Sequence, residues 1–368
     1  MTGRGIDHVM AHPCPPILYE GYVQSALDYV HLAEAVNGPI PRGVDRSYVW
    51  GAALGELAQA RPDLRIVNLE TSITRSEDFV PKGINYRMSP ENADCLTAAE
   101  IDCCVLANNH VLDWGRAGLL DTLATLKRVR IKTSGAGNDL DAASAPAVFE
   151  VAGKGRVLVF SYASTTSGTP TDWAATPDAP GVNLLPEPPK AGAALACEQI
   201  MRVRQSDDVV VVSIHWGSNW GHDVPDWQRR LAHMLIDKAD VSIVYGHSSH
   251  HAKAMEIYGD RLILYGCGDF LNDYEGIKGH EEYRGDLVVM YIADIDPTNR
   301  DVMALELVPL QIKQFHLVRP SQDDVRWLAE TLDRESQRFW LSVAPLSNGR
   351  IAVSSRGLLG GAILNLRR

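Results

Sequence analysis

Five apolar stretches of this sequence are each followed by side chains that can bind a metal ion or move a proton. They are residues 66–70, ending in Glu70; 103–110, ending in Asn109 and His110; 209–217, with His215; 241–250, with His247 and His250; and 261–270, with Asp269. Short apolar runs of this kind are typical of buried strands in a parallel sheet. Because the carboxyl ends of such strands share one edge of the sheet, we expect these side chains to lie together there.

One pair among them has the spacing of an acid–base unit. Asp113 follows His110 by three residues, and Asn109 directly precedes His110. An amide oxygen is a hard metal ligand, and a histidine beside it can exchange protons with a substrate held at that metal. A carboxylate three residues on can orient the imidazole and raise its basicity. The alternative is an Asn-His turn in which Asp113 caps a helix.

The remaining candidates are predicted metal ligands. Glu70 directly follows an apolar strand, so its charge must be paired or coordinated, unless it caps a helix. His215 follows a fully buried run, where a lone histidine is more often a core residue than a ligand. His247 and His250 lie in a short motif whose glycine lets the backbone turn, so both imidazoles can face one cavity. Asp269 can pair with one of these histidines or bind metal through water.

This donor set predicts a divalent metal ion and no organic cofactor. Imidazole suits transition metals, whereas carboxylate, amide and water suit hard cations, so the mixture does not distinguish Ca, Mn, Zn and Fe. A hard cation such as Ca is compatible with it.

Composition excludes several classes of protein. The chain has 368 residues, 45% of them hydrophobic, which is enough for a large core. Its formal charge of −11 argues against a nucleic-acid partner, because phosphate contacts need clustered Lys and Arg. We find no membrane-spanning run and no secretory signal, and the six cysteines form no Cys-x-x-Cys pair. We therefore expect a reduced, cytoplasmic protein without a membrane partner.

Strands and helices alternate along the chain, which predicts the α/β class. Helical patterns occupy 92–100, 117–129 and 225–238, a strand is predicted at 156–162, and 163–190 is predicted to be a long surface loop. Two late strands, 286–295 and 304–312, are predicted to be antiparallel. We expect one domain over 1–318 and a helical extension over 319–368 packed on it, its helix capped by Ser321 and Asp324.

Six motifs in order resemble the CapA family, which is named for poly-γ-glutamate capsule synthesis and belongs to the calcineurin-like metallophosphoesterases. They are Asn-Leu-Glu-Thr (68–71), Leu-Ala-Asn-Asn-His-Val-Leu-Asp-Trp-Gly (106–115), Ser-Gly-Ala-Gly (134–137), Ile-His-Trp-Gly (214–217), Gly-His-Ser-Ser-His (246–250) and Tyr-Gly-Cys-Gly-Asp-Phe (265–270). The resemblance implies a four-layer α-β-β-α sandwich with a metal site at the strand ends. It also implies ligand roles for Glu70, Asn109, His215, His247 and His250, with His110 as acid or base.

The amino end departs from the family pattern, which opens with a strand and then Gly-Asp-Val-Met-x-Gly-Arg-Gly, whose Asp is a metal ligand. Here Met1-Thr2-Gly3-Arg4-Gly5 begins just after that Asp should appear. Either the start is assigned too late, or the strand and its ligand are missing. In the second case the two-metal clamp of phosphoester hydrolysis is incomplete.

Three functions are compatible with these observations. The favoured one is a metal-dependent Cα-epimerase, because the chain is similar to the lasso-peptide epimerases of this family. There His110–Asp113 and His250–Asp269 are the two acid–base groups, and the substrate is a residue, predicted to be C-terminal, of a ribosomally made lasso precursor peptide. Arg4, Trp114 and Trp216 are predicted to contact that peptide. The alternatives are a metal-dependent phosphoesterase or capsule-polymer enzyme, and a non-catalytic binding module.

Overall fold

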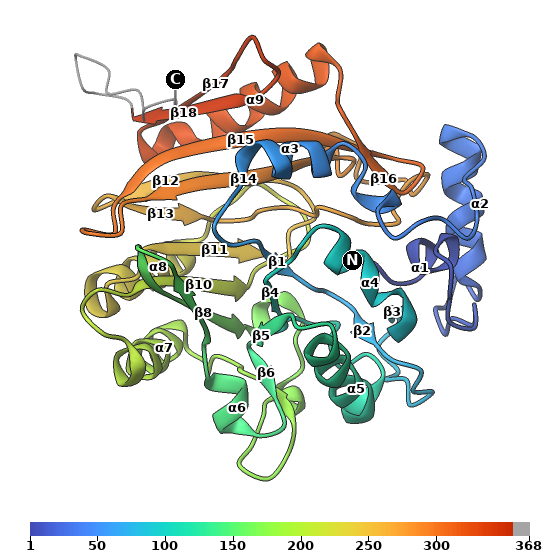
Figure 1. Ribbon diagram of the computed structural model, residues 1–368, viewed down its shortest axis with the longest axis horizontal. Helices are drawn as coiled ribbons and strands as arrows, with labels where there is room; N and C mark the ends of the chain where they lie inside the picture. Colours follow the sequence, from blue (N-terminus) through green and yellow to red (C-terminus); the bar gives the residue numbers. More distant parts are fainter. Residues whose placement is uncertain (356–368) are drawn as a thin grey trace.

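Three main β-sheets form the framework of the protein in this computed structural model, which describes residues 1–355 (Figure 1). The first has the order β1-β4-β5 and consists of Ile66–Asn68 (β1), Cys103–Val105 (β4) and Lys132–Ser134 (β5). All three strands run parallel. This sheet places the turns that carry Glu70 and Asn109 at its carboxyl edge.

The second sheet has six strands in the order β12-β13-β11-β10-β8-β7. They are Met255–Tyr258 (β12), Arg261–Leu264 (β13), Ile243–His247 (β11), Val209–His215 (β10), Gly155–Ala163 (β8) and Ala147–Val151 (β7). The four central strands run parallel, and the two edge strands run antiparallel to their neighbours. The buried run of β10 matches the near-continuous apolar sequence expected of a central parallel strand.

The third sheet is antiparallel and has the order β14-β15-β18-β17, with β16 also paired to β15. Its strands are Leu287–Ile295 (β14), Val302–Lys313 (β15), His316–Val318 (β16), Leu341–Pro345 (β17) and Ile351–Ser355 (β18). Two-strand ribbons are formed by Ser72–Ile73 (β2) with Arg87–Met88 (β3), and by Ala136–Gly137 (β6) with Gly181–Val182 (β9). The prediction of late antiparallel strands is confirmed.

The helices cover these sheets. They are Gly5–Val9 (α1), Ala26–Asn37 (α2), Ala53–Ala60 (α3), Asp94–Ala98 (α4), Gly115–Arg128 (α5), Leu140–Ser144 (α6), Pro189–Val203 (α7), Asp226–Ala239 (α8) and Gln322–Ser336 (α9). Short 3-10 turns occur at Tyr48–Trp50, Pro90–Ala93, Thr165–Ser167, Thr171–Trp173, Glu281–Tyr283 and Gln337–Phe339. Helices α7 and α8 pack together beside the six-stranded sheet, and α9 lies against the third sheet (Figure 1).

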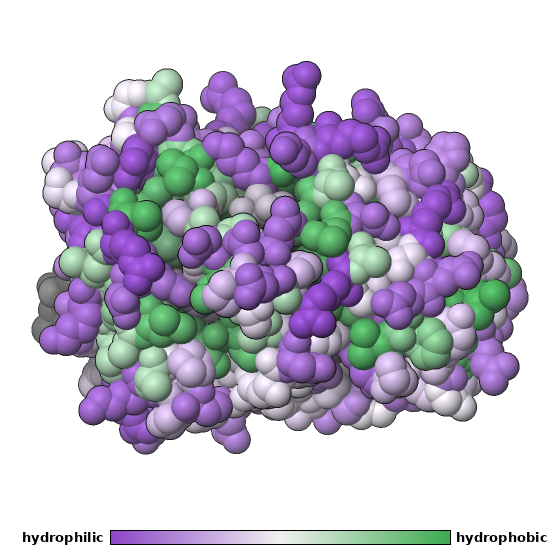
Figure 2. All heavy atoms as spheres, turned by 90° about the horizontal axis from the view of Figure 1, so that it is seen from below, coloured by the Kyte–Doolittle hydropathy of each residue, from purple (hydrophilic) through white to green (hydrophobic). Residues whose placement is uncertain are grey.

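Cores between the sheets hold the molecule together. Cys103 of β4 packs with Val159 of β8 and Val211 of β10, whereas its neighbour Cys104 belongs to a separate core with α5. The two cysteines therefore face opposite sides of the strand, as the alternation of side chains along a strand requires. All six cysteines are free. On the face seen in Figure 2, hydrophilic residues predominate, and hydrophobic ones form separate patches between them.

The structure is thus mixed α/β, as the sequence predicts, while the four-layer order stays a prediction. Strand β4 ends at Val105, earlier than the predicted end near Asn109, because Leu106 to Asn109 form the turn at the sheet edge. The predicted surface loop contains β9 and the buried Trp173, so part of it belongs to the core.

The carboxyl-terminal extension also differs from expectation. Its helix α9 begins with the predicted capping box between Ser321 and Asp324. Two strands, β17 and β18, follow that helix, and β18 pairs with β15 of the third sheet. The extension is therefore helix and strand rather than helical; residues 356–368 of the predicted extension lie outside the described part.

Candidate metal centre

Neighbouring parallel strands bring two histidines together. His215 ends β10, and His247 ends β11, and the strand register pairs the two residues directly. Their Nδ1 atoms lie 2.6 Å apart, and the second imidazole also contacts Ser213 Oγ through Nε2 at 2.7 Å. Burial lowers the pKa of both rings, that of His247 to about 3, so both are neutral at neutral pH.

The turns after β1 and β4 bring oxygen donors to the same place. His215 Nε2 lies 3.0 Å from Asn109 Oδ1 and 3.8 Å from Glu70 Oε1. One ligand atom each from Glu70, His215 and His247 falls within 4.8 Å of the others, the one such group of His, Cys, Asp and Glu among residues 1–355. Neutral imidazoles beside a carboxylate and an amide oxygen are a donor set that fits a divalent cation.

Glu70 lies in an environment expected of a carboxylate that binds a cation. Its side chain is buried, and Asn68 Nδ2 donates to Oε2 at 2.9 Å. The pKa of the Glu70 carboxyl is raised to about 7, chiefly because burial and the nearby Asp269 disfavour its charge, against the opposing effects of His250 and Lys82. A cation bound at this point would favour the ionised form.

His110 forms the predicted pair with Asp113. Their Nδ1 and Oδ2 atoms lie 2.7 Å apart, and the backbone N–H of Tyr86 donates to the same carboxylate oxygen at 2.6 Å. Burial lowers the pKa of His110 to about 4, although Asp113 raises it. With Nδ1–H donating to Asp113, Nε2 of the neutral ring is left free to accept a proton.

Lys82 contacts both members of this pair, although no motif in the sequence indicated a role for it. Its Nζ lies 2.7 Å from Asp113 Oδ1 and 3.2 Å from His110 Nδ1, and it donates to the backbone oxygen of Asn109. It also lies 5.0 Å from the centre of the Trp173 ring. Lys82 therefore connects the turn that carries a metal-ligand candidate with the acid–base pair.

A second histidine–carboxylate pair lies nearby. His250 Nδ1 is 3.2 Å from Asp269 Oδ1, and Nε2 is 3.5 Å from the Tyr274 hydroxyl. Asn272 Nδ2 donates to the other Asp269 oxygen at 2.9 Å. Burial alone would lower the pKa of His250, but Asp269 raises it above its ordinary value. His250 is paired here rather than grouped with Glu70, His215 and His247, so its predicted ligand role stays a prediction.

The three predicted substrate contacts are interior residues. Arg4 is buried and bound by Asp273 Oδ1 at 2.6 Å and Glu20 Oε1 at 2.9 Å. Trp114 Nε1 donates to the backbone oxygen of Tyr86 at 3.2 Å, and Trp216 Nε1 to that of Tyr265 at 3.0 Å. The polar side-chain atoms of these residues already form bonds within the protein. These contacts anchor the residues in the interior, and they do not support a role in binding substrate.

Comparison with known proteins agrees with these motifs. The family model Bacterial capsule synthesis protein PGA_cap matches residues 1–274, most of the chain. The protein therefore belongs to this capsule synthesis family, the CapA family that the six motifs resemble. Within residues 1–355 no helix is both long and apolar enough to cross a membrane.

Relatives include proteins named for polymer synthesis. The chain is 44% identical over 345 residues to a probable polyglutamine synthesis accessory protein of Mycobacterium tuberculosis (strain ATCC 25618 / H37Rv), covering 93% of this chain and 90% of that protein. It is 25% identical over 277 residues to the PGA biosynthesis protein CapA of Bacillus subtilis (strain 168), covering 74% and 68% of the two chains. A further similar protein is the capsule biosynthesis protein CapA of Bacillus anthracis, 25% identical over 238 residues, with 63% and 53% covered.

Proposed function

We propose that the protein is a metal-dependent enzyme that serves the synthesis of a polyglutamate- or polyglutamine-type polymer by hydrolysing an acyl or phosphoryl bond in the polymer or its precursor. The observation that carries the proposal is the convergence of Glu70, Asn109, His215 and His247 beside the His110–Asp113 pair. The names of the relatives supply the polymer class. The fold that goes with this proposal is the four-layer sandwich of the metallophosphoesterases.

The metal would be held by Glu70, His215 and His247, with the amide oxygen of Asn109 beside them. A divalent ion at such a site polarises a substrate oxygen and lowers the pKa of bound water, and single-ion hydrolases show that one ion suffices for this chemistry. An incomplete two-metal clamp therefore does not by itself exclude hydrolysis.

The protein's own residues supply the proton transfers. His110 is held through Nδ1 by Asp113, so its Nε2 can take a proton from the attacking group. Lys82 keeps the Asp113 carboxylate in place and offsets its charge. His250, fixed by Asp269 and Tyr274, is the group that can return a proton to a leaving atom.

The test is hydrolysis by protein stripped with a chelator and reloaded in turn with Mn, Zn, Fe or Ca. With one of these ions, we expect the protein to shorten γ-linked glutamate oligomers or α-linked polyglutamine, or to hydrolyse a phosphodiester. Mass spectrometry of the products measures the reaction. His110→Ala should abolish turnover. His31→Ala, which changes an exposed histidine of α2, is the matched control and should leave it intact. Metal binding without turnover of any of these compounds would point to a binding module instead.

Epimerisation at a peptide α-carbon is the second candidate, favoured by one observation. The site has two separate histidine–carboxylate pairs, His110–Asp113 and His250–Asp269, whereas inversion of a carbon needs two acid–base groups, one for each face. Incubation of a lasso precursor peptide and of glutamate oligomers in deuterated water tests it. Incorporation of one solvent deuterium at an α-carbon, with chain length unchanged, would favour this reaction over hydrolysis.

A further inference from the structure

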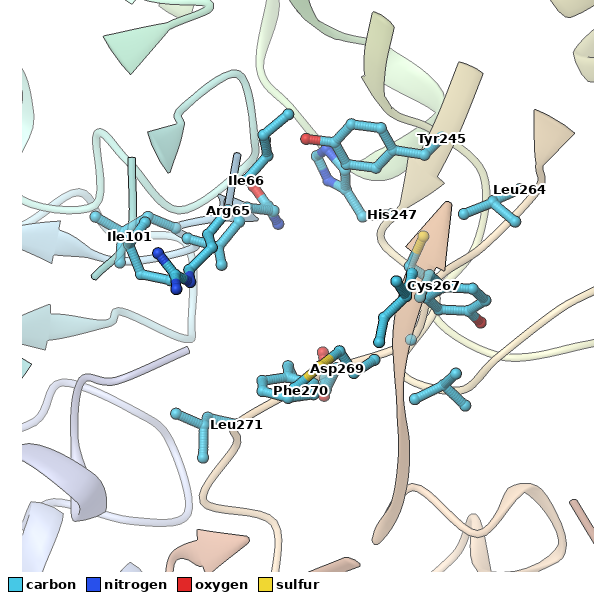
Figure 3. A pocket seen from close by; sticks show the side chains of 18 of the residues that line it. Arg65, Ile66, Ile101, Tyr245, His247, Leu264, Cys267, Asp269, Phe270 and Leu271 are labelled. Atoms are coloured by element: carbon cyan, nitrogen blue, oxygen red, sulfur yellow. The ribbon is translucent and has the colours of Figure 1, made fainter. Parts of the chain in front are cut away.

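Two cavities of the protein are lined by different kinds of side chain. One, of about 360 Å³, has His247 and Asp269 in its wall and belongs to the candidate metal centre (Figure 3). The other, of about 630 Å³, is an open hollow bordered by the end of α5, by β5, by α6 and by β7. The two share no lining residue in the described part of the chain. The hollow is therefore a separate feature, and the proposed reaction at the metal centre makes no use of it.

Three cations line this hollow. Lys127 lies in the last turn of α5, Arg130 in the turn that follows, and Lys132 at the start of β5, and all three are exposed. Arg130 has a left-handed backbone (φ 63), which lets the chain turn from the helix into the strand. No Asp or Glu is among the lining residues that the structure describes. Asp139, close by in the sequence, accepts the backbone N–H of Ala142 as the cap of α6. The lining charge is thus of one sign.

These charges are not neutralised within residues 1–355, because none of the three cations takes part in an ion pair there. Lys132 Nζ donates to the backbone oxygen of Val148 and lies 4.7 Å from the centre of the Phe149 ring, and neither contact involves a carboxylate. By contrast, Lys154 in the turn between β7 and β8 pairs with Asp63 at 2.7 Å. The hollow therefore concentrates unpaired positive charge in a chain whose formal charge is −11.

Carboxylates suit this hollow better than neutral groups do. Like charges gathered in a hollow focus their field, so they attract an anion more strongly than they would on a flat surface. A carboxylate also accepts charge-assisted hydrogen bonds from Lys and Arg, whereas a carboxamide carries no charge. A long rigid polyanion or an anionic membrane would also meet the negative charge of the rest of the protein. A single flexible chain can place its carboxylates in the hollow alone.

We propose that this cationic hollow, defined by Lys127, Arg130 and Lys132, is a second binding site that holds a carboxylate-rich polymer chain apart from the metal centre. The hollow lies against β5, and the metal centre follows β1 and β4 of the same sheet, so one long chain can reach both. Binding at the hollow raises the effective concentration of that chain at the metal centre. The identity of the polymer rests on the proposed function, and the charge of the hollow selects polyglutamate over polyglutamine.

Fluorescence anisotropy of a labelled γ-linked glutamate oligomer tests this proposal on chelator-treated full-length protein, where no turnover takes place. We expect the glutamate oligomer to bind, added salt to weaken that binding, and a glutamine oligomer of the same length not to bind. The double variant Lys127→Gln/Arg130→Gln should weaken binding by about tenfold or more. Lys132 is left unchanged because its ammonium group also holds the backbone of β7.

The matched control is Lys238→Gln/Lys313→Gln. Lys238 lies in the last turn of α8, as Lys127 does in α5, and Lys313 ends β15; both are exposed and lie outside the hollow. The control changes the net charge by the same amount, so it separates the hollow from the overall charge of the protein. We expect its affinity for the glutamate oligomer to equal that of the unmodified protein.

Four results would overturn the proposal. They are no binding of the glutamate oligomer, equal weakening by the two double variants, equal binding of the glutamine oligomer, and equal competition by free glutamate at the same carboxylate concentration. The last would show a site for small anions. Tighter binding of a single-stranded RNA that depends on Lys127 and Arg130 would assign the hollow to nucleic acid instead. His110→Ala should bind the oligomer normally, so a failure of the proposed reaction with binding intact affects only that reaction.

Discussion

His215 and His247 occupy directly paired positions at the ends of two parallel strands, and their Nδ1 atoms lie 2.6 Å apart. Two neutral imidazoles at this distance must share one proton between them, or turn their lone pairs toward a common cation. Because both rings are buried and their pKa values are lowered, a second proton is unfavourable here. This pairing is the geometric basis of the metal centre.

Replacing His247 should therefore reduce metal binding. We expect His247→Asn to weaken divalent-ion affinity by more than about a hundredfold, since even outer partners of metal ligands contribute ten- to a hundredfold. Isothermal titration and elemental analysis of the chelator-treated and reloaded protein provide the measurement, with His31→Ala as the control. Unchanged affinity with an intact fold would remove His247 from the ligand set.

His110 should behave differently because it is assigned to proton transfer. His110→Ala should abolish turnover and leave metal content near that of the unmodified protein, since its Nδ1 is held by Asp113 rather than grouped with the ligand atoms. Metal content and activity are measured on the same preparation. A parallel loss of both would show that His110 acts through the metal site instead.

Asp113→Asn should lower both rate and stability. The carboxylate accepts the backbone N–H of Tyr86, pairs with Lys82 and holds His110. In the Asn variant one carboxylate oxygen becomes an NH₂ group, so one of these contacts would bring two donors together. We expect a loss of about 1–3 kcal/mol in the free energy of unfolding, the cost typical of a buried hydrogen-bonding defect. Denaturant titration measures the stability, and kcat with metal content held constant measures the positioning of His110. A rate equal to that of the unmodified protein would remove Asp113 from the mechanism.

The strand-end residues were predictable from sequence because a parallel sheet turns linear order into proximity. The apolar runs before Glu70, Asn109, His215 and His247 predict buried strands, and the structure brings these four side chains together. The spacing of His110 and Asp113 likewise predicted their contact, which is present at 2.7 Å. Their roles in catalysis and metal binding remain predictions.

Other features depend on contacts that no local pattern records. Lys82 lies in an irregular segment between β2 and β3, without hydrophobic periodicity, and reaches the site only through the fold. Arg4 lies in a motif that suggests ligand contact, yet Glu20 and Asp273 neutralise it in the interior. Strands β17 and β18 were missed because only pairing across the third sheet stabilises such short segments.

The last prediction concerns the contact between the third sheet and α9. Arg284, just before β14, donates to Asp286 Oδ1 and to Asp324 Oδ1, both at 2.9 Å. Burial alone would raise the pKa of each carboxyl, but hydrogen bonds, including those from Arg284, lower both below the ordinary value. The stabilisation is therefore complete above the unfolded-state pKa of about 4 and is lost as pH falls through the lower folded values.

Arg284→Met should remove this pH-dependent contribution. Because these side chains are partly exposed, we expect a loss of only about 1 kcal/mol in the free energy of unfolding at pH 7. As the pH falls from about 5 to 2, the stability of the variant should decline less steeply than that of the unmodified protein, so the two curves should converge. Arg326→Met, which removes only an exposed pair with Asp323 on α9, is the control and should change the curve little. Denaturant unfolding over this pH range measures the difference, and parallel curves for the two proteins would show that Arg284 does not lower the pKa values of these carboxyls.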